Sequence, residues 1–253
     1  MEVDERPGEW TATAVAAQTV LPPLEEKPAY VRKIFCEIAP QYEAMNRLIS
    51  LGQVVRWRRT LLRRCRIGTD ARVLDVGTGT GALAYEIAHR HPDAEVWGCD
   101  VADPMLEVGR NHNRGERVHL LHGDAMALPF ADDTFDTVTS AFVMRNVGDL
   151  GLALREQVRV TLPGGRVACL EICPPAARNL AAPFFHFHFF RVVPCLGRMI
   201  TGSPDAYRYL PHSTLAFLSP PRLAEAMREA GLRDVTYERC TFGVVAVHVG
   251  TVA

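Results

Sequence analysis

A chain of 253 residues with a formal net charge of −1 and a hydrophobic fraction of 48% is expected to form one soluble globular domain. Its near-neutral charge argues against a nucleic-acid binder that depends on overall basicity, and no apolar run approaches the roughly 18 residues of a membrane span. Seven cysteines without a Cys-x-x-Cys pair indicate reduced thiols in a cytoplasmic protein, and without a His-Glu-x-x-His or Cys/His set no metal site is expected.

The first quarter of the chain is expected to hold a tail and a helical cap. Residues 1–27 contain three prolines and no clear hydrophobic period, which predicts a flexible tail. Apolar residues at helical spacing predict a cap over 28–68, with helices at 28–39, 42–51 and 54–66 and with Pro40 ending the first.

The helix at 54–66 carries six arginines around an apolar stripe. Two interpretations are open. The arginines form a solvated charged face on a core-packed helix, or they make a peripheral contact with anionic lipid.

Residues 72–90 predict a buried strand, a glycine-rich loop and an amphipathic helix. Glycine permits positive φ and lets a ligand approach the backbone, which accounts for Gly77, Gly79 and Gly81. The start of the helix then presents unpaired N–H groups. The segment therefore predicts a nucleotide-type cradle at the carboxyl end of a parallel sheet.

Strand and helix signals alternate after the cradle. This order predicts a doubly wound, mostly parallel sheet, because crossover connections make neighbouring strands parallel. Two last strands predict an antiparallel hairpin at the sheet edge, giving seven strands in all. The further strands are expected at 94–99, 117–121, 135–142, 166–172, 235–239 and 243–249, with helices at 103–113 and 151–160. Asp103 is expected to cap its helix, and 163–165 to form a turn before a strand.

The segment 174–221 interrupts this alternation and is expected to be a helical insertion over the substrate pocket. Positions 183–190 contain five phenylalanines. They predict either a buried core helix or the wall of an apolar pocket or lid. His186 and His188 would face different ways on a helix.

The cradle alone fits two ligands, because Gly77-x-Gly79-x-x-Ala82 also satisfies a dinucleotide fingerprint. A dehydrogenase normally begins with its glycine loop and has a separate substrate domain, whereas helices precede the loop here. Acidic residues at successive strand ends suit the cationic sulfur of S-adenosylmethionine better than a pyrophosphate. Asp100 would hold the ribose and Asp124 would lie near the adenine amine. The predicted cofactor-binding residues are Asp75, Gly77, Gly79, Thr80, Gly81, Asp100, Asp124, Ala125 and Ser140.

Several narrower motifs accompany the cradle: Tyr42-Glu-Ala-Met-Asn46, Asp124-Ala-x-x-Leu-Pro-Phe130, Arg145-Asn-Val147, Arg159-Val-x-x-Pro-Gly-Gly165 and Asp205-Ala-Tyr-Arg-Tyr-Leu210. With them, residues 30–250 resemble the ubiquinone/menaquinone biosynthesis C-methyltransferase family, class I methyltransferases that methylate a polyprenylated ring carbon. The chain departs from the family pattern at Glu43, Val54, Leu162 and Cys173. These departures leave the cofactor motifs intact and concern the substrate.

The resemblance implies a Rossmann-like α/β fold, S-adenosylmethionine as cofactor, and Arg145, Asn146 and Tyr42 as catalytic residues. Arg145 would stabilise a phenolate or hold a water, since arginine is a poor base; its alternative role is an ion pair with Asp149 or Glu171. Tyr207 and Tyr209 would line the pocket mouth or pack in the core.

The implied substrate is a demethylmenaquinol or related prenylated quinol. A soluble aromatic or polyketide-like acceptor, a catalytically silent cofactor-binding protein and a nicotinamide dehydrogenase are the alternatives. The expected partner is an apolar aromatic small molecule and not nucleic acid, with peripheral membrane contact and a homodimer left open.

Overall fold

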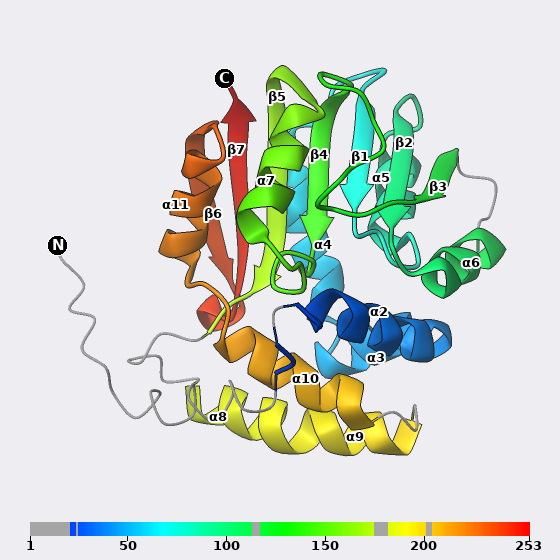
Figure 1. Ribbon diagram of the computed structural model, residues 1–253, viewed down its shortest axis with the longest axis vertical. Helices are drawn as coiled ribbons and strands as arrows, with labels where there is room; N and C mark the ends of the chain where they lie inside the picture. Colours follow the sequence, from blue (N-terminus) through cyan, green and yellow to red (C-terminus); the bar gives the residue numbers. More distant parts are fainter. Residues whose placement is uncertain (1–20, 24, 113–116, 175–181, 201–203) are drawn as a thin grey trace, which may run out of the picture.

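The computed structural model describes residues 21–23, 25–112, 117–174, 182–200 and 204–253. Its centre is a seven-stranded sheet in the order β3-β2-β1-β4-β5-β7-β6 (Figure 1). The first five strands in this order pair in parallel, and β7 is antiparallel to both of its neighbours. The expected mixed sheet with a terminal hairpin is confirmed. The strands are β1 Arg72–Val76, β2 Glu95–Asp100, β3 Val118–His122, β4 Phe135–Ala141, β5 Thr161–Ile172, β6 Leu232–Cys240 and β7 Val245–Val252.

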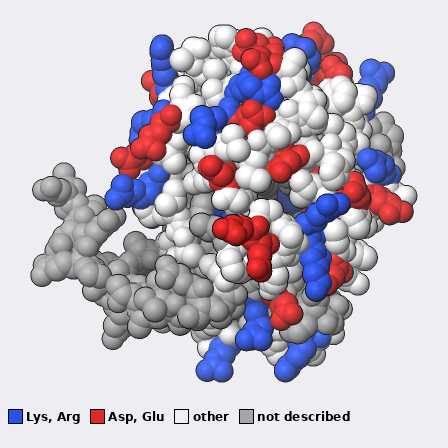
Figure 2. All heavy atoms as spheres, viewed as in Figure 1, with Lys and Arg blue, Asp and Glu red and all other residues white. Residues whose placement is uncertain are grey.

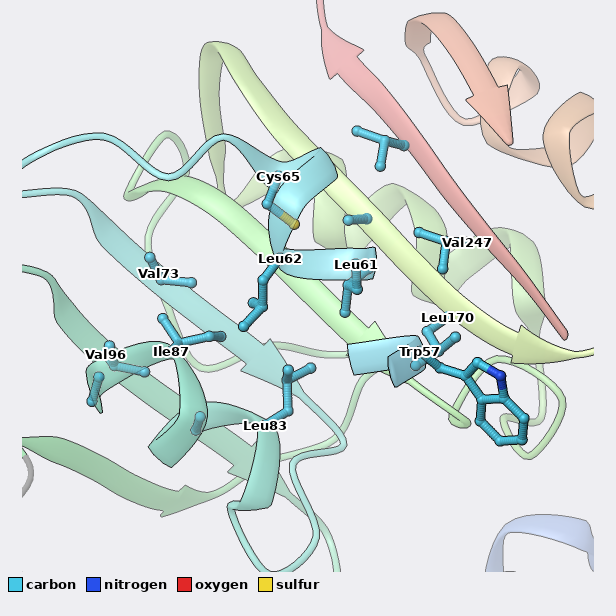
Figure 3. Close-up of a cluster of buried hydrophobic side chains, with 14 of the residues drawn as sticks. Trp57, Leu61, Leu62, Cys65, Val73, Leu83, Ile87, Val96, Leu170 and Val247 are labelled. Carbon is cyan, nitrogen blue, oxygen red and sulfur yellow. The ribbon is translucent and has the colours of Figure 1, made fainter. Parts of the chain in front are cut away.

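One face of the sheet is covered by α4 (Gln53–Cys65) and α5 (Ala82–Arg90). Their apolar side chains meet those of the strands in a single cluster, in which Leu61 and Ile87 are fully buried against Val73 and Leu170 (Figure 3). The opposite face is covered by α7 (Leu150–Arg159) and α11 (Pro220–Glu229), which bury a second cluster. Both faces of the sheet are covered, so the central strands β1 and β4 are buried along most of their length rather than at alternate residues.

A third layer of helices lies below the carboxyl ends of β1, β2 and β4 (Figure 1). It buries its own apolar cluster, which is formed by side chains of α2, α3, α9 and α10 together with α6. The helices are α2 Lys27–Ile38, α3 Tyr42–Ile49, α6 Asp103–His112, α8 Ala182–Phe187, α9 Val193–Ile200 and α10 Pro204–Leu215. The ammonium of Lys27 donates to the carbonyl of Val147 at 3.0 Å and so joins α2 to the loop after β4. This layer closes the sheet edge at which parallel α/β proteins bind ligands.

Two local expectations were wrong, and the end of the first helix near Pro40 was confirmed. Helix α2 ends at Ile38, and a 3-10 turn over Ala39–Gln41 that contains Pro40 leads into α3. Residues 163–165 lie within β5, where a register shift takes up the extra residues and Gly164 has φ +77°. Asp103 lies inside α6 rather than capping it, because the carbonyl of Ala102 accepts the first helical hydrogen bonds.

The arginine-rich helix α4 packs as a core helix. Its apolar stripe, Val54, Trp57, Leu61, Leu62 and Cys65, is buried against the sheet. Arg58 pairs with Glu43, and Arg63 and Arg64 pair with Glu238. The apolar stripe therefore faces the core, as the first interpretation expects, and a contact of the exposed arginines with anionic lipid stays a prediction.

Basic and acidic side chains are mixed over the face shown in Figure 2. Within the described residues, no helix combines the length and apolar character needed to cross a bilayer. Nor do three or more His, Cys, Asp or Glu side chains gather there in a way that would hold a metal ion. Residues 1–20 of the predicted tail lie outside the described residues, whereas Leu21 packs against the third layer.

The packing of α4 predicts the effect of truncating Leu61, which has no exposed surface. Leu61→Ala should lower the free energy of unfolding by about 2–5 kcal/mol, since it removes buried methyl groups and leaves a cavity. Urea denaturation would measure the loss. Arg59→Ala, an exposed position on the same helix, should change stability by less than about 0.5 kcal/mol. Equal losses in the two variants would contradict this packing.

Candidate active site

An open cleft of about 800 Å³ lies where the carboxyl ends of β1, β2 and β4 meet the helical layer. It is lined by the glycine loop, by the ends of the three strands and by the inner side of α2. The lining includes Pro28, Val31, Phe35, Tyr42, Gly77, Gly79, Asp100, Asp124, Ala125, Phe142 and Asn146. Five of the predicted cofactor-binding residues, Gly77, Gly79, Asp100, Asp124 and Ala125, therefore lie together in one cleft.

The glycine loop needs its glycines for two different reasons. A Cβ on Gly77 would lie 2.3 Å from a methyl of Val143, so the backbone packs too closely for a side chain. A Cβ on Gly79 would meet only the ring of Tyr42, at 3.8 Å, so this position is open toward the cleft. Gly79 also has φ +57°, in the left-handed region that favours glycine. The loop thus presents bare backbone to a ligand.

Asp100 connects the end of β2 to this loop. Its carboxylate accepts hydrogen bonds from the backbone N–H groups of Gly79 and Ala102, both at 2.8 Å. Burial raises the pKa of Asp100, and these hydrogen bonds oppose that shift. Each carboxylate oxygen keeps a second lone pair, so the group can still accept hydrogen bonds from the hydroxyls of a bound ribose.

Four other predicted residues support the loop without lining the cleft. Asp75 is buried and accepts hydrogen bonds from the hydroxyls of Thr78 at 2.7 Å and Thr139 at 2.9 Å. Thr80 contacts Glu43 through its hydroxyl at 3.4 Å, and Gly81 precedes α5. Ser140 donates to the sulfur of Cys169. Their direct contact with a cofactor stays a prediction.

A second chamber of about 790 Å³ adjoins the cleft. The two spaces share four lining residues: Phe35, Tyr42, Phe142 and Asn146. The rest of the second chamber is largely apolar and aromatic, and its lining includes Ile34, Ile49, Trp57, Ile172, Phe189 and Leu210. All three predicted catalytic residues, Tyr42, Arg145 and Asn146, line it. We call it the acceptor chamber, because a molecule held there would lie next to one held in the cleft.

The polar atoms of the acceptor chamber are incompletely paired. Three of its lining side chains carry a buried polar atom with no hydrogen-bond partner among the described residues: Arg145 Nε, Asn146 Oδ1 and the Tyr209 hydroxyl. Buried polar groups are normally hydrogen-bonded, and leaving one unpaired costs about 1–3 kcal/mol. Their convergence on one apolar chamber indicates a ligand with both hydroxyl groups and apolar surface.

Arg145 forms the ion pair that the sequence offered as its alternative role, while its catalytic role stays a prediction. Its Nη1 donates to Glu171 at 3.0 Å, and the two side chains are only 6% and 1% exposed. Glu171 also accepts from the backbone N–H of Met144 at 2.7 Å, and burial raises its pKa. Asp149, the other proposed partner, instead caps α7 by accepting from Leu152. The ion pair holds the Arg145 guanidinium at the chamber wall.

Phe142 holds the side chains of Arg145 and Asn146, two of the predicted catalytic residues, and sequence reasoning missed this contact. Phe142 has φ +64°, an uncommon conformation for a bulky residue. Its carbonyl accepts from Arg145 Nη1 at 2.8 Å and from Asn146 Nδ2 at 2.9 Å. Because Nδ2 of Asn146 donates to this carbonyl, its Oδ1 points away from Phe142 and has no hydrogen-bond partner among the described residues. Backbone strain of this kind concentrates at functional sites, and it cannot be predicted from a sequence pattern.

Asn46 was also missed as a site residue, although a signal was available. It lies four residues after Tyr42 on α3, and side chains four apart share a helix face. A hydrogen bond between the two side chains opposes the rise that burial causes in the pKa of Tyr42. The helical spacing therefore identifies Asn46 once Tyr42 is placed in the site.

Comparison with known proteins identifies the family of this chain. The model of the ubiE/COQ5 methyltransferase family matches residues 24–252. The chain belongs to this family. It is 42% identical over 92% of its length to a demethylmenaquinone methyltransferase of Roseiflexus sp., covering 97% of that protein. It is 47% identical over 86% of its length to a demethylmenaquinone methyltransferase of Thermus thermophilus, covering 99% of that protein.

A solved SAM-dependent methyltransferase from Thermotoga maritima has the same fold, with a TM-score of 0.61 at 20% identity over 87% of this chain and 99% of that one. The protein is thus an S-adenosylmethionine-dependent methyltransferase with a class I, Rossmann-like fold. The nicotinamide interpretation of the glycine fingerprint is not supported. The residues of the cleft fit S-adenosylmethionine, since bare backbone and carboxylates suit an amino acid, a ribose and a cationic sulfur.

The burial of Asp75 predicts a pH-dependent contribution to stability. Burial raises the pKa of this carboxyl to about 6 in the folded state, against about 3.9 in an unfolded chain. Protonated Asp75 therefore stabilises the folded state below about pH 4, and this contribution to the free energy of unfolding is lost as the pH rises through 6. The loss amounts to about 3 kcal/mol, at 1.36 kcal/mol per pKa unit.

Asp75→Asn, which stays neutral, should lack this loss. The stability of the natural protein relative to the variant should therefore fall between pH 4 and pH 7, as measured by urea denaturation of both proteins at each pH. Subtraction cancels the other titrating groups. Parallel stability curves would show that Asp75 does not titrate in this range.

Proposed function

We propose that this protein transfers the methyl group of S-adenosylmethionine to a ring carbon of a demethylmenaquinol or a related prenylated quinol. The observation that carries the proposal is the acceptor chamber, a largely apolar space beside the cofactor cleft. Three of its lining side chains carry a buried polar atom without a hydrogen-bond partner among the described residues. An aromatic ring with hydroxyl groups would meet both requirements. The two relatives named as demethylmenaquinone methyltransferases support the same acceptor class.

The residues of the cleft would hold the cofactor in a defined orientation. Gly77 and Gly79 leave room for its amino-acid part, Asp100 would accept from its ribose hydroxyls, and Asp124 lies in the same lining. Bound there, S-adenosylmethionine supplies a methyl group attached to a cationic sulfur. Asp75, Thr80, Gly81 and Ser140 would act through the shape of the loop and the strand ends around it.

The shared wall would place the acceptor ring. Tyr42 and Phe142 line both spaces, so a ring held against them lies next to the cleft. Such placement converts a bimolecular reaction into an effectively unimolecular one, and in small-molecule models it is worth about 7–11 kcal/mol. Apolar side chains around the ring would exclude water.

Arg145 would stabilise the phenolate that makes a ring carbon nucleophilic. Its guanidinium stays protonated at ordinary pH and cannot act as the base. A positive charge in a buried site favours the deprotonated oxygen, and Asn146 and Tyr209 would orient the ring through their free polar atoms. The ring carbon then forms a bond to the methyl group as the bond from methyl to sulfur breaks. Loss of the proton from that carbon restores the aromatic ring.

We also propose where the protein acts and how it is organised. The protein would be cytoplasmic and would contact the membrane surface to reach a prenylated acceptor. A homodimer would be compatible with both the cytoplasm and the membrane surface. We also propose that residues 28–253 form one methyltransferase domain, with 1–27 as a tail. The insertion at 174–221 would cover the acceptor, in accord with the position of Phe189, Tyr207 and Tyr209 in the chamber lining.

The reaction is tested directly with S-adenosylmethionine labelled in its methyl group. Incubation with a reduced demethylmenaquinone in detergent should place the label on the quinone ring, detected by mass spectrometry after reoxidation. The oxidised quinone is the matched control and should stay unlabelled, because it lacks the hydroxyls that activate the ring. Labelling of soluble aromatic acceptors, with none of the quinol, would contradict the proposal.

The role of Arg145 is tested by separating its charge from its ion pair. Arg145→Gln alone leaves the Glu171 carboxylate buried and unpaired, which should destabilise the protein by about 3–5 kcal/mol. The double variant Arg145→Gln with Glu171→Gln removes both charges together. We expect it to fold and to bind S-adenosylhomocysteine, but to lose turnover by at least about a hundredfold, since electrostatic stabilisation of this kind is worth about 3 kcal/mol or more.

Glu171→Gln alone is the control, because it keeps the Arg145 charge and an acceptor for Met144. It also breaks the buried ion pair and should lower the free energy of unfolding, so turnover is compared at a temperature at which both variants are folded. The control should retain most of the activity. If the double variant turns over as fast as Glu171→Gln, Arg145 has only a structural role.

A further inference from the structure

The exposed apolar side chains of this protein are concentrated on one part of its surface. Nine large hydrophobic residues are exposed within the described part of the chain, and six of them lie on α8, α9 and the end of α3. Scattered exposed apolar residues are normal, but a concentration marks an interaction site. The six are Leu48, Leu51, Phe184, Phe187, Met199 and Ile200.

Helices α8 and α9 are joined by a π-helical turn at His188–Val192 and form the outermost layer, at the bottom of Figure 1. Residues at four-residue spacing, Phe185, Phe189, Val193 and Gly197, are buried and face the rest of the protein. The other side carries Phe184, Phe187 and Met199, which are 65%, 63% and 75% exposed. The two helices are therefore apolar on both sides.

The inner side of this layer belongs to the acceptor chamber. Phe189 lines the chamber, and Gly197 leaves room for the ring of Tyr207, another lining residue. The end of α3 lies beside it, because the ring of His188 hydrogen-bonds the carbonyl of Ile49 at 2.8 Å. Leu48 and Leu51 therefore extend the exposed side of α8 and α9. One wall thus separates the proposed quinol site from this outer surface.

The charge of the segment selects the kind of partner. Residues 182–200 contain Arg191 and Arg198 and no acidic residue, and both arginines are exposed. Basic side chains also lie along the lower edge of the molecule in Figure 2, where Figure 1 shows α9. A helical face with phenylalanine, methionine and arginine but no carboxylates is typical of helices that lie in a bilayer interface. Anionic headgroups would pair with the arginines.

We propose that the outer side of α8 and α9, together with the end of α3, docks on a bilayer that contains anionic phospholipids. We call it the docking face: Leu48, Leu51, Phe184, Phe187, Arg191, Arg198, Met199 and Ile200. The proposal rests on the proposed function in one respect, because a prenylated acceptor dissolves in the bilayer. Docking on this face places the acceptor chamber one helical layer away from the lipid.

The test compares the binding of the full chain to phosphatidylcholine vesicles with and without phosphatidylglycerol, by flotation. The docking variant is Phe187→Asp with Met199→Asp, at two exposed positions that touch neither the cleft nor the chamber. The natural protein should float with the anionic vesicles. The docking variant should bind them at least about tenfold more weakly, because it loses apolar insertion and adds two negative charges.

Two controls separate this face from general effects. Leu152→Asp places the same change at an exposed position on α7. Arg56→Glu with Arg59→Glu reverses the charge of exposed positions on α4. Both controls should bind like the natural protein. The α4 variant changes the net charge more than the docking variant does, so a purely electrostatic attachment would be more sensitive to it.

Methylation of a short-chain demethylquinol in detergent distinguishes a failure of docking from a failure of the proposed function. The docking variant should methylate this acceptor at the normal rate. If neither the natural protein nor any variant methylated this acceptor, the proposed function would be wrong, while the conclusion from vesicle flotation would be unaffected. Unchanged flotation of the docking variant, loss of flotation in the α4 variant, or no flotation of the natural protein would each overturn the docking face. A dimer in sedimentation that the docking variant lacks would assign the face to a second copy.

Discussion

The site depends on the position of β1 at the centre of the parallel strands. The chain passes from β1 to β2 and β3 on one side and then returns to β4 on the other. Connections that leave neighbouring strands in opposite directions leave a crevice at their carboxyl ends. The glycine loop, Asp100 and the strand end before Phe142 all reach this crevice from different strands. The helical layer then has only to close it.

Burial of polar groups shapes the chemistry within the crevice. Asp75 and Glu171 both have raised pKa values because the protein removes them from water. Asp75 is offset by two threonine hydroxyls and Glu171 by a guanidinium and a backbone N–H. The acceptor chamber lacks such compensation at three buried polar atoms, on Arg145, Asn146 and Tyr209. Asp75 and Glu171 therefore differ from these atoms in having partners within the protein.

Local pattern was sufficient to predict most elements and the core of the cofactor cleft. The glycine loop, its helix and the seven strands follow from short-range periodicity and turn residues, and the parallel pairing follows from their alternation, whereas the order of the strands was not predicted. The catalytic set came instead from resemblance, because Tyr42 and Arg145 are brought together only by the tertiary fold. Which phenylalanines face inward was not predictable either, since phenylalanines occur on both sides of this segment: Phe185 and Phe189 are buried, whereas Phe184 and Phe187 are exposed. The strain at Phe142 depends on neighbours distant in sequence.

The wall shared by the cleft and the acceptor chamber has a thermodynamic consequence. Phe35, Tyr42, Phe142 and Asn146 each line both spaces, so a ligand that orders these side chains from one side changes the free energy of binding on the other. Such coupling is reciprocal: the factor by which the methyl donor alters affinity for the acceptor equals the factor by which the acceptor alters affinity for the donor. Tyr42 also packs beside Gly79 in the cofactor loop. Conversion of the donor to its demethylated product would therefore change the surroundings of the same ring that contacts the acceptor. Release of the two products would then be linked rather than independent.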